Sequence, residues 1–84
     1  MSSLAALPNI GKVLEQNLLT IGVTTPDELR ELGAKAAFLQ IRGEVDSGAC
    51  LHMLYGLQGA VENIRGSKLS EATKQNLQTF FRSL

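Results

Sequence analysis

The chain has no excess of either charge. Its 84 residues include eight lysines and arginines and eight aspartates and glutamates, so the formal net charge at pH 7 is zero. Proteins that coat DNA or RNA usually carry a basic excess, because their affinity comes largely from phosphate neutralisation and counterion release. The balance argues against strong nucleic-acid binding and leaves only weak binding through a local patch.

Cysteine and histidine each occur once. Cys50 alone cannot form an intrachain disulfide, and one thiolate with one imidazole cannot build a zinc site. A small domain without disulfides fits a reducing compartment. The chain has no signal-peptide pattern at its start and no apolar run approaching the roughly 18–20 residues that cross a membrane. We therefore predict a single cytoplasmic domain over residues 1–84, with no membrane segment, metal or cofactor.

Aromatic residues are also scarce: the chain has three Phe, one Tyr and no Trp. Its core must therefore be made mostly of Leu, Ile, Val and Ala, which suits packed helices. No segment alternates polar and apolar residues over the length of a strand. The sequence predicts an all-α fold, a compact bundle of about five short helices.

Glycine, proline and helix-capping residues mark where these helices begin and end. The first follows Gly11, where apolar residues recur at helical spacing and Val13 widens the stripe, and it stops at Gly22. The second begins at "TTPDEL", where Thr25 and Glu28 form a capping box around a proline. The other three are expected over 34–42, over 50–64 and from Ser70 onward. Their predicted buried residues are Ala37, Phe38 and Ile41, then Cys50, Leu54, Leu57, Val61 and Ile64, then Leu77, Phe80 or Phe81, and Leu84.

The turn "LPNIGK" before the first helix has two interpretations. Backbone N–H groups at a helix N-terminus favour anions, so Asn9, Gly11 and Lys12 are candidate phosphate-binding residues. Two residues argue against phosphate binding. Val13 is uncharged at a position where phosphate-binding turns often have a second basic residue, and Glu15 would repel phosphate. Asn9 stands where such turns usually have glycine, although asparagine tolerates the left-handed conformation. We favour a turn that fixes the angle between two helices, with Lys12 in solvent.

A second candidate surface lies on the predicted fourth helix. His52 and Tyr55 stand three residues apart, and Gly56 and Gly59 interrupt the helix. Bare backbone there suggests that a neighbouring helix or a partner comes very close. These four residues form a candidate partner interface. Alternatively, Tyr55 only covers the edge of the core, with its hydroxyl in water.

The residues show no arrangement that is typical of catalysis. Cys50 falls on the apolar stripe of its helix, which predicts a buried structural cysteine. His52 lies roughly 200° around the helix from it, so the two cannot form a nucleophile and base. No glycine-rich nucleotide loop or spaced carboxylate pair is present. The protein is therefore predicted not to be an enzyme.

Three stretches carry a family resemblance: "LPNIGKVLEQNL" (7–18), "LRELGAKAAFLQIR" (29–42) and "CLHMLYGLQGAVENIR" (50–65). Together they resemble the C-terminal domain of the TfoX/Sxy family, regulators of DNA transformation competence in bacteria. The first third of the chain also resembles a helix-hairpin-helix unit. The resemblance implies a helical domain, SAM-like or helix-hairpin-helix-like, that commonly follows a separate N-terminal domain. This chain is then either a single-domain relative or an excised piece.

Three functions follow as hypotheses. The first is a regulatory module acting by protein contact in competence control; the resemblance implies a DNA-bound activator of the cyclic-AMP receptor class as partner. The second is a weak, sequence-independent DNA binder through the Pro8–Lys12 turn. The third is a structural domain that forms a homodimer through its fourth helix.

Overall fold

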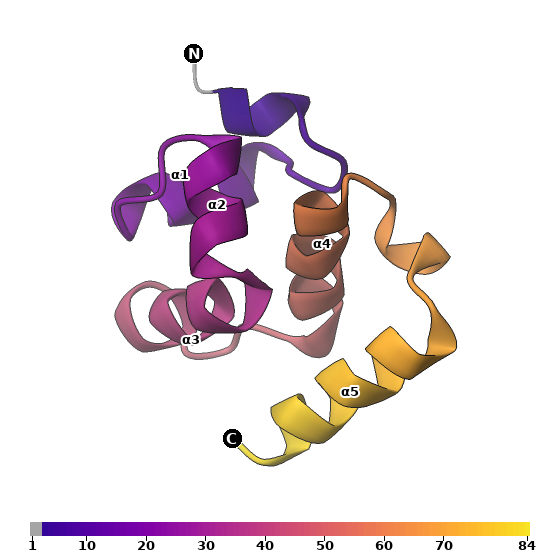
Figure 1. Cartoon of the computed structure of the whole chain (residues 1–84). Coiled ribbons are helices and arrows are strands. Elements are labelled where there is room, and N and C mark those ends of the chain that lie inside the picture. The colour runs from indigo at the N-terminus through magenta and orange to yellow at the C-terminus, as the bar shows by residue number, and fades with distance from the viewer. Residues whose placement is uncertain (1–2) are drawn as a thin grey trace.

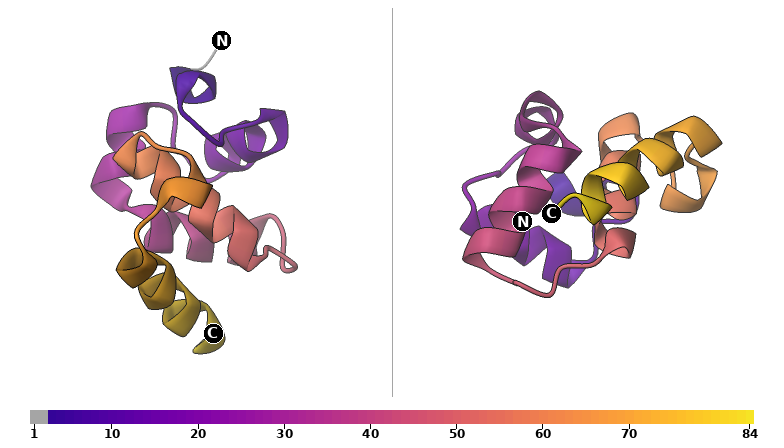
Figure 2. Two further views of the ribbon diagram at one scale, coloured as in Figure 1. Left: turned by 90° about the vertical axis from the view of Figure 1, so that its right-hand side faces the viewer. Right: turned by 90° about the horizontal axis from the view of Figure 1, so that it is seen from below.

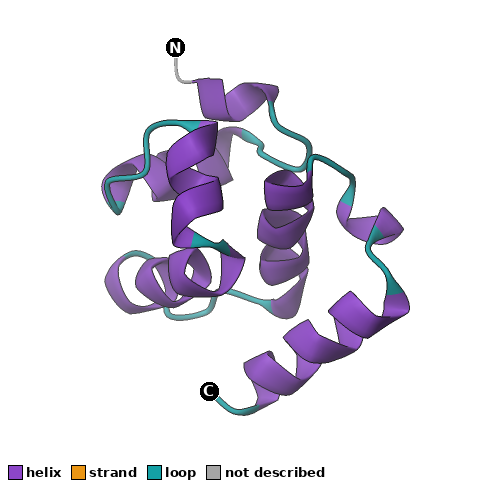
Figure 3. Cartoon of the chain, in the orientation of Figure 1, coloured by secondary structure: helices purple, strands orange, loops and turns teal. Residues whose placement is uncertain are grey.

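The computed structural model describes residues 3–84, and this part of the chain consists of helices and turns without a strand (Figure 3). The all-α prediction and the number of main helices are confirmed. Two short 3-10 helices add to them. In chain order the elements are η1 (Ser3–Ala6), α1 (Lys12–Thr20), α2 (Pro26–Leu32), α3 (Ala34–Glu44), α4 (Leu51–Glu62), η2 (Gly66–Lys68) and α5 (Glu71–Arg82).

The start of α2 follows the predicted capping box. The backbone N–H of Glu28 donates to the Thr25 hydroxyl, and the Glu28 carboxylate accepts from the backbone N–H of Thr25, both at 3.1 Å. The carboxylate also accepts from the hydroxyl and the backbone N–H of Thr24. These bonds, led by the one from the Thr24 hydroxyl, hold the pKa of Glu28 below its ordinary value.

The start of α5 also agrees with the prediction, because Ser70 caps it by accepting from the backbone N–H of Thr73. The ends of two other helices differ from the prediction by two residues. α3 continues to Glu44, two residues beyond its predicted end. α4 ends at Glu62 because Asn63 adopts the left-handed conformation (φ 62°), which turns the chain toward η2.

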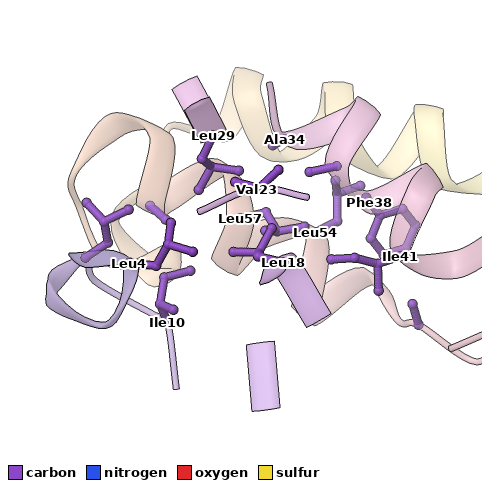
Figure 4. Close-up of a cluster of buried hydrophobic side chains, with 14 of the residues drawn as sticks. Leu4, Ile10, Leu18, Val23, Leu29, Ala34, Phe38, Ile41, Leu54 and Leu57 are labelled. Carbon is purple, nitrogen blue, oxygen red and sulfur yellow. The ribbon is translucent and has the colours of Figure 1, made fainter. Parts of the chain in front are cut away.

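The core lies around α4. Figure 1 shows α2 and α3 on one side of this helix, η2 on the other, and α5 running beneath it. Figure 4 shows Leu54 and Leu57 of α4 meeting Phe38 of α3 and Leu18 of α1. Burying a Leu or Phe side chain stabilises the fold by about 1.5–3 kcal/mol. The buried apolar residues are Leu4, Leu7, Ile10, Leu18, Val23, Leu29, Ala34, Ala37, Phe38, Ile41, Ala49, Leu54, Leu57, Ala60, Leu69 and Leu77.

α5 packs against α4 and reaches α3 with its C-terminal end (Figures 1 and 2). The rings of Phe38 and Phe81 lie 6.0 Å apart between centroids, and the Lys35 amine lies 5.3 Å from the centroid of Phe80. Both α5 phenylalanines are half-buried. Leu84, predicted on the buried side, is exposed because α5 ends at Arg82.

Val13 is a second correction to the predicted core. It was expected to widen the buried stripe of α1, yet 73 % of its surface is exposed. Val13 is the second residue of α1 and stands in the first turn of the helix. Val61 and Ile64, predicted on the buried face of α4, are only half-buried.

Candidate functional site

The turn before α1 contains a residue in the left-handed conformation that glycine usually adopts. Asn9 adopts a positive φ of 70°, as the sequence allowed, and the neighbouring Leu7 and Ile10 are buried. The backbone N–H of Leu7 donates to the carbonyl of Leu4 at 3.0 Å, which joins the turn to η1. The resemblance to a helix-hairpin-helix unit stays a prediction, because the element before the turn is a four-residue 3-10 helix.

The side chain of Asn9 has a role that the sequence did not reveal. Its Nδ2 donates to the carbonyls of Gly56 (3.2 Å) and Ile64 (2.9 Å), and its Oδ1 accepts from the backbone N–H of Gly66 (3.2 Å). Both amide hydrogens are therefore used within the chain. The amide ties the turn to α4 and to the start of η2. Of the candidate phosphate ligands, only Gly11 and Lys12 face solvent without such bonds.

Gly59 explains how Asn9 fits. A Cβ at Gly59 would lie 2.5 Å from Asn9 Nδ2 and 2.6 Å from the carbonyl oxygen of Ile64. The close neighbour that the sequence suggested is therefore part of the same chain. Gly59 is buried, next to these atoms. A Cβ at Gly56 would meet only Asn9 Cβ, at an ordinary 3.5 Å.

Tyr55 and His52 lie on the side of α4 next to α5. The Tyr55 hydroxyl accepts a hydrogen bond from Gln78 Nε2 at 2.8 Å. The half-buried Tyr55 ring packs against the edge of the core, as one interpretation predicted, and the bond links α4 to α5. His52 is exposed.

Cys50 is a further correction to the predicted core, because it is exposed. It is the N-cap of α4, with extended backbone (φ −105°, ψ 168°), so helical spacing does not set its direction. The buried residue at this point is its neighbour Ala49, which is 5 % exposed.

The two candidate surfaces meet in one open groove of about 1000 Å³, which we call the α1–α4 groove. Four parts of the chain line it: the turn and first turn of α1, the N-terminal half of α4, the segment around η2, and α5. The lining residues are Asn9, Gly11, Lys12, Val13 and Leu14, then Cys50, His52, Met53, Tyr55 and Gly56, then Arg65, Gly66 and Ser67, then Lys74 and Gln78. The groove thus includes every candidate residue except Gly59.

The α1–α4 groove is basic although the chain is neutral. Lys12, Arg65 and Lys74 line it, and no carboxylate of residues 3–84 does. The helices that begin there, α1 and α4, have no side-chain cap at Gly11 and Cys50. Their first N–H groups add partial positive charge to the groove.

Comparison with known sequences identifies the family. The chain matches the family described as "TfoX C-terminal domain" over residues 1–81. The chain belongs to this family. The match agrees with the three resembling stretches, two of which supply residues that line the groove.

A curated relative of this TfoX C-terminal domain is the "DNA transformation protein TfoX" of Haemophilus influenzae. The two are 34 % identical over 77 residues, which is 92 % of this chain. The chain spans about a third (35 %) of the length of that relative.

Two crystal structures of Listeria monocytogenes proteins have the same fold as this TfoX C-terminal domain. One is titled an uncharacterized protein (triclinic form) and the other a protein of unknown function (tetragonal form). Each is 51 % identical to this chain, with a TM-score of 0.92 over 95 % of it. The match covers 90 % of the first protein and 96 % of the second.

Two further features are absent from residues 3–84 of this TfoX C-terminal domain. There, no three His, Cys, Asp or Glu side chains come together as a metal site would require. Within the same residues, no helix is both long enough and apolar enough to span a membrane.

Proposed function

We propose that this TfoX C-terminal domain is a non-enzymatic regulatory module that works in DNA transformation competence by binding another protein. The family and the name of the Haemophilus relative support a role in DNA transformation. The α1–α4 groove supports the mode of action. From the family resemblance, the proposed partner is a transcriptional activator of the cyclic-AMP receptor class.

The single observation that carries a binding role is the exposure of Val13 inside the groove. Val13 is the most exposed of the large apolar residues, at 73 %, and it lies beside the half-buried Leu14 and Met53. Apolar surface gathered in a concave site is typical of a binding surface. The groove holds three cations, one imidazole and no carboxylate of residues 3–84, which favours a partner surface that carries negative charge.

A deletion of the gene in its own organism tests the process. We expect the frequency of transformation by marked chromosomal DNA to fall, and a plasmid copy of the natural gene to restore it. Transcript levels of DNA-uptake genes should fall in parallel if the protein acts on transcription. An unchanged transformation frequency under conditions that induce competence would contradict the proposal.

A second candidate function is weak, sequence-independent DNA binding, which the exposed Lys12 at the uncapped start of α1 favours. If Lys12, Arg65 and Lys74 contact phosphates, a plot of the logarithm of affinity against the logarithm of salt concentration would have a slope of about −2 to −3. Titration of a labelled duplex at two salt concentrations, with Lys12→Glu as comparison, tests this function. No binding at low salt would exclude it.

A further inference from the structure

We infer that the α1–α4 groove receives an acidic, amphipathic segment of the partner protein, an inference that rests on the proposed function and specifies the chemistry of its partner. The apolar side chains of the segment would contact Val13 and Met53. Its carboxylates would pair with Lys12, Arg65 and Lys74. Charge, apolar exposure and groove shape each support this occupant.

Charge is the first argument. The groove holds three of the chain's eight lysines and arginines and, within residues 3–84, none of its acidic residues. Of the three groove cations, only Lys74 has a carboxylate of the described chain within 4 Å, that of Glu71 at 3.9 Å. Lys12 and Arg65 are exposed and lack such a partner. Complementary charge across an interface selects the partner and speeds association.

The apolar residues are the second argument. Val13 lies directly beside Lys12 in the chain, and Met53 and Leu14 line the same groove. The contact area they offer would supply affinity, while the surrounding cations orient the ligand. A segment with apolar residues on one face and carboxylates beside them matches both features.

Shape and composition favour a protein segment over DNA. A duplex would place phosphates against Val13 and Met53, where apolar side chains cannot hydrogen-bond to them. The Asn9 amide, a candidate phosphate ligand, is already bonded to Gly56, Ile64 and Gly66. A volume of about 1000 Å³ is at the upper end for small-molecule pockets, about 300–1,000 Å³, and suits a longer segment.

Selection from a displayed library of random 16-residue peptides tests the inference with the 84-residue chain as bait. The counter-bait is the double variant Lys12→Glu with Arg65→Glu. Lys68→Glu is the matched control, because Lys68 is exposed on η2 and does not line the groove. Circular dichroism and thermal melting establish that all three baits are folded. Enriched peptides are then synthesised, and their affinities are measured by fluorescence anisotropy at low and high salt.

We expect enriched peptides to combine apolar residues at helical spacing with Asp and Glu. The double charge reversal in the groove should weaken them by about ten-fold or more, whereas Lys68→Glu should change affinity less than two-fold. Enrichment of basic or neutral peptides, or equal binding to the counter-bait, would overturn the inference. Failure to enrich any peptide would also overturn it. So would binding of a DNA duplex to the natural chain that is lost in the double variant Lys12→Glu with Arg65→Glu.

Failure of this inference and failure of the proposed function are distinguishable. If deletion lowers transformation but acidic peptides do not bind the groove, only the inference is wrong. If acidic peptides bind but deletion leaves transformation unchanged, the groove chemistry stands and the proposed process is wrong.

Discussion

The side-chain nitrogen of Asn9 occupies the place that a side chain at Gly59 would need: a Cβ there would lie 2.5 Å from it. The two residues stand fifty positions apart and together fix the turn on α4. This contact positions Gly11, Lys12 and Val13 beside the N-terminal half of α4. The groove therefore depends on a joint between two segments that are distant in sequence.

Gly59→Ala should destabilise the protein by about 1–3 kcal/mol, because the new methyl group must displace Asn9 and the backbone of Ile64. For a domain of this size that lowers the melting temperature by roughly 4–8 °C per kcal/mol. Gly56→Ala is the matched control. Its methyl group would meet Asn9 Cβ at an ordinary 3.5 Å, and alanine favours the helix by up to about 1 kcal/mol. Equal melting temperatures for the two variants would contradict this account of Gly59.

Asn9→Ala should cost about 2–3 kcal/mol, from the loss of three hydrogen bonds and from alanine in the left-handed conformation. Asn9→Gly loses the same bonds but keeps the conformation, so it should be more stable than Asn9→Ala by about 1 kcal/mol. Urea unfolding measures both. A cost below about 0.5 kcal/mol for Asn9→Ala would show that the amide does not hold the turn.

Cys50 should react with a thiol reagent in the folded protein, because the structure exposes it at the start of α4. One equivalent of label is expected without denaturant, at a rate close to that in urea. Labelling that requires denaturant would restore the buried position predicted from the sequence. Since Cys50 lines the groove, a ligand bound there should slow the reaction.

Glu28→Gln should lower the melting temperature at neutral pH, because the carboxylate accepts the N-terminal hydrogen bonds before α2. The pKa of Glu28 is lowered in the folded state, so its contribution is fully present above the ordinary value of about 4.5. The contribution is lost as pH falls through the lowered pKa. The difference between natural protein and variant should therefore disappear in acid. A difference that is constant down to pH about 2 would contradict this origin.

Local rules explain which parts of the fold could be predicted. The capping box at Thr25 and Glu28 and the cap at Ser70 depend on residues three positions apart, so the sequence displays them directly. The errors at Cys50 and Val13 have a common cause. Cys50 is the N-cap of α4 and Val13 is the second residue of α1, so both stand at a helix N-terminus, where helical spacing does not determine which side chains are covered.

The groove could be predicted only in parts. The sequence marked residues 9–12 and 52–59 as two separate candidates, one for DNA and one for a partner. The two surfaces lie side by side because Asn9 donates hydrogen bonds to the carbonyls of Gly56 and Ile64, which are 47 and 55 residues away in the sequence. Arg65 and Lys74 were not marked as partner residues, because nothing in their local sequence indicates that they face the same groove.

The most direct measurement of the central claim compares two exposed apolar residues in the living cell. Val13→Glu places a carboxylate in the groove at the start of α1, where acidic residues favour the helix. Leu39→Glu makes the same change on α3, at a residue that is 44 % exposed and outside the groove. With equal protein levels by immunoblot, the account predicts that Val13→Glu lowers transformation toward the deletion strain while Leu39→Glu transforms normally. Equal transformation by the two variants would contradict a functional role for the groove.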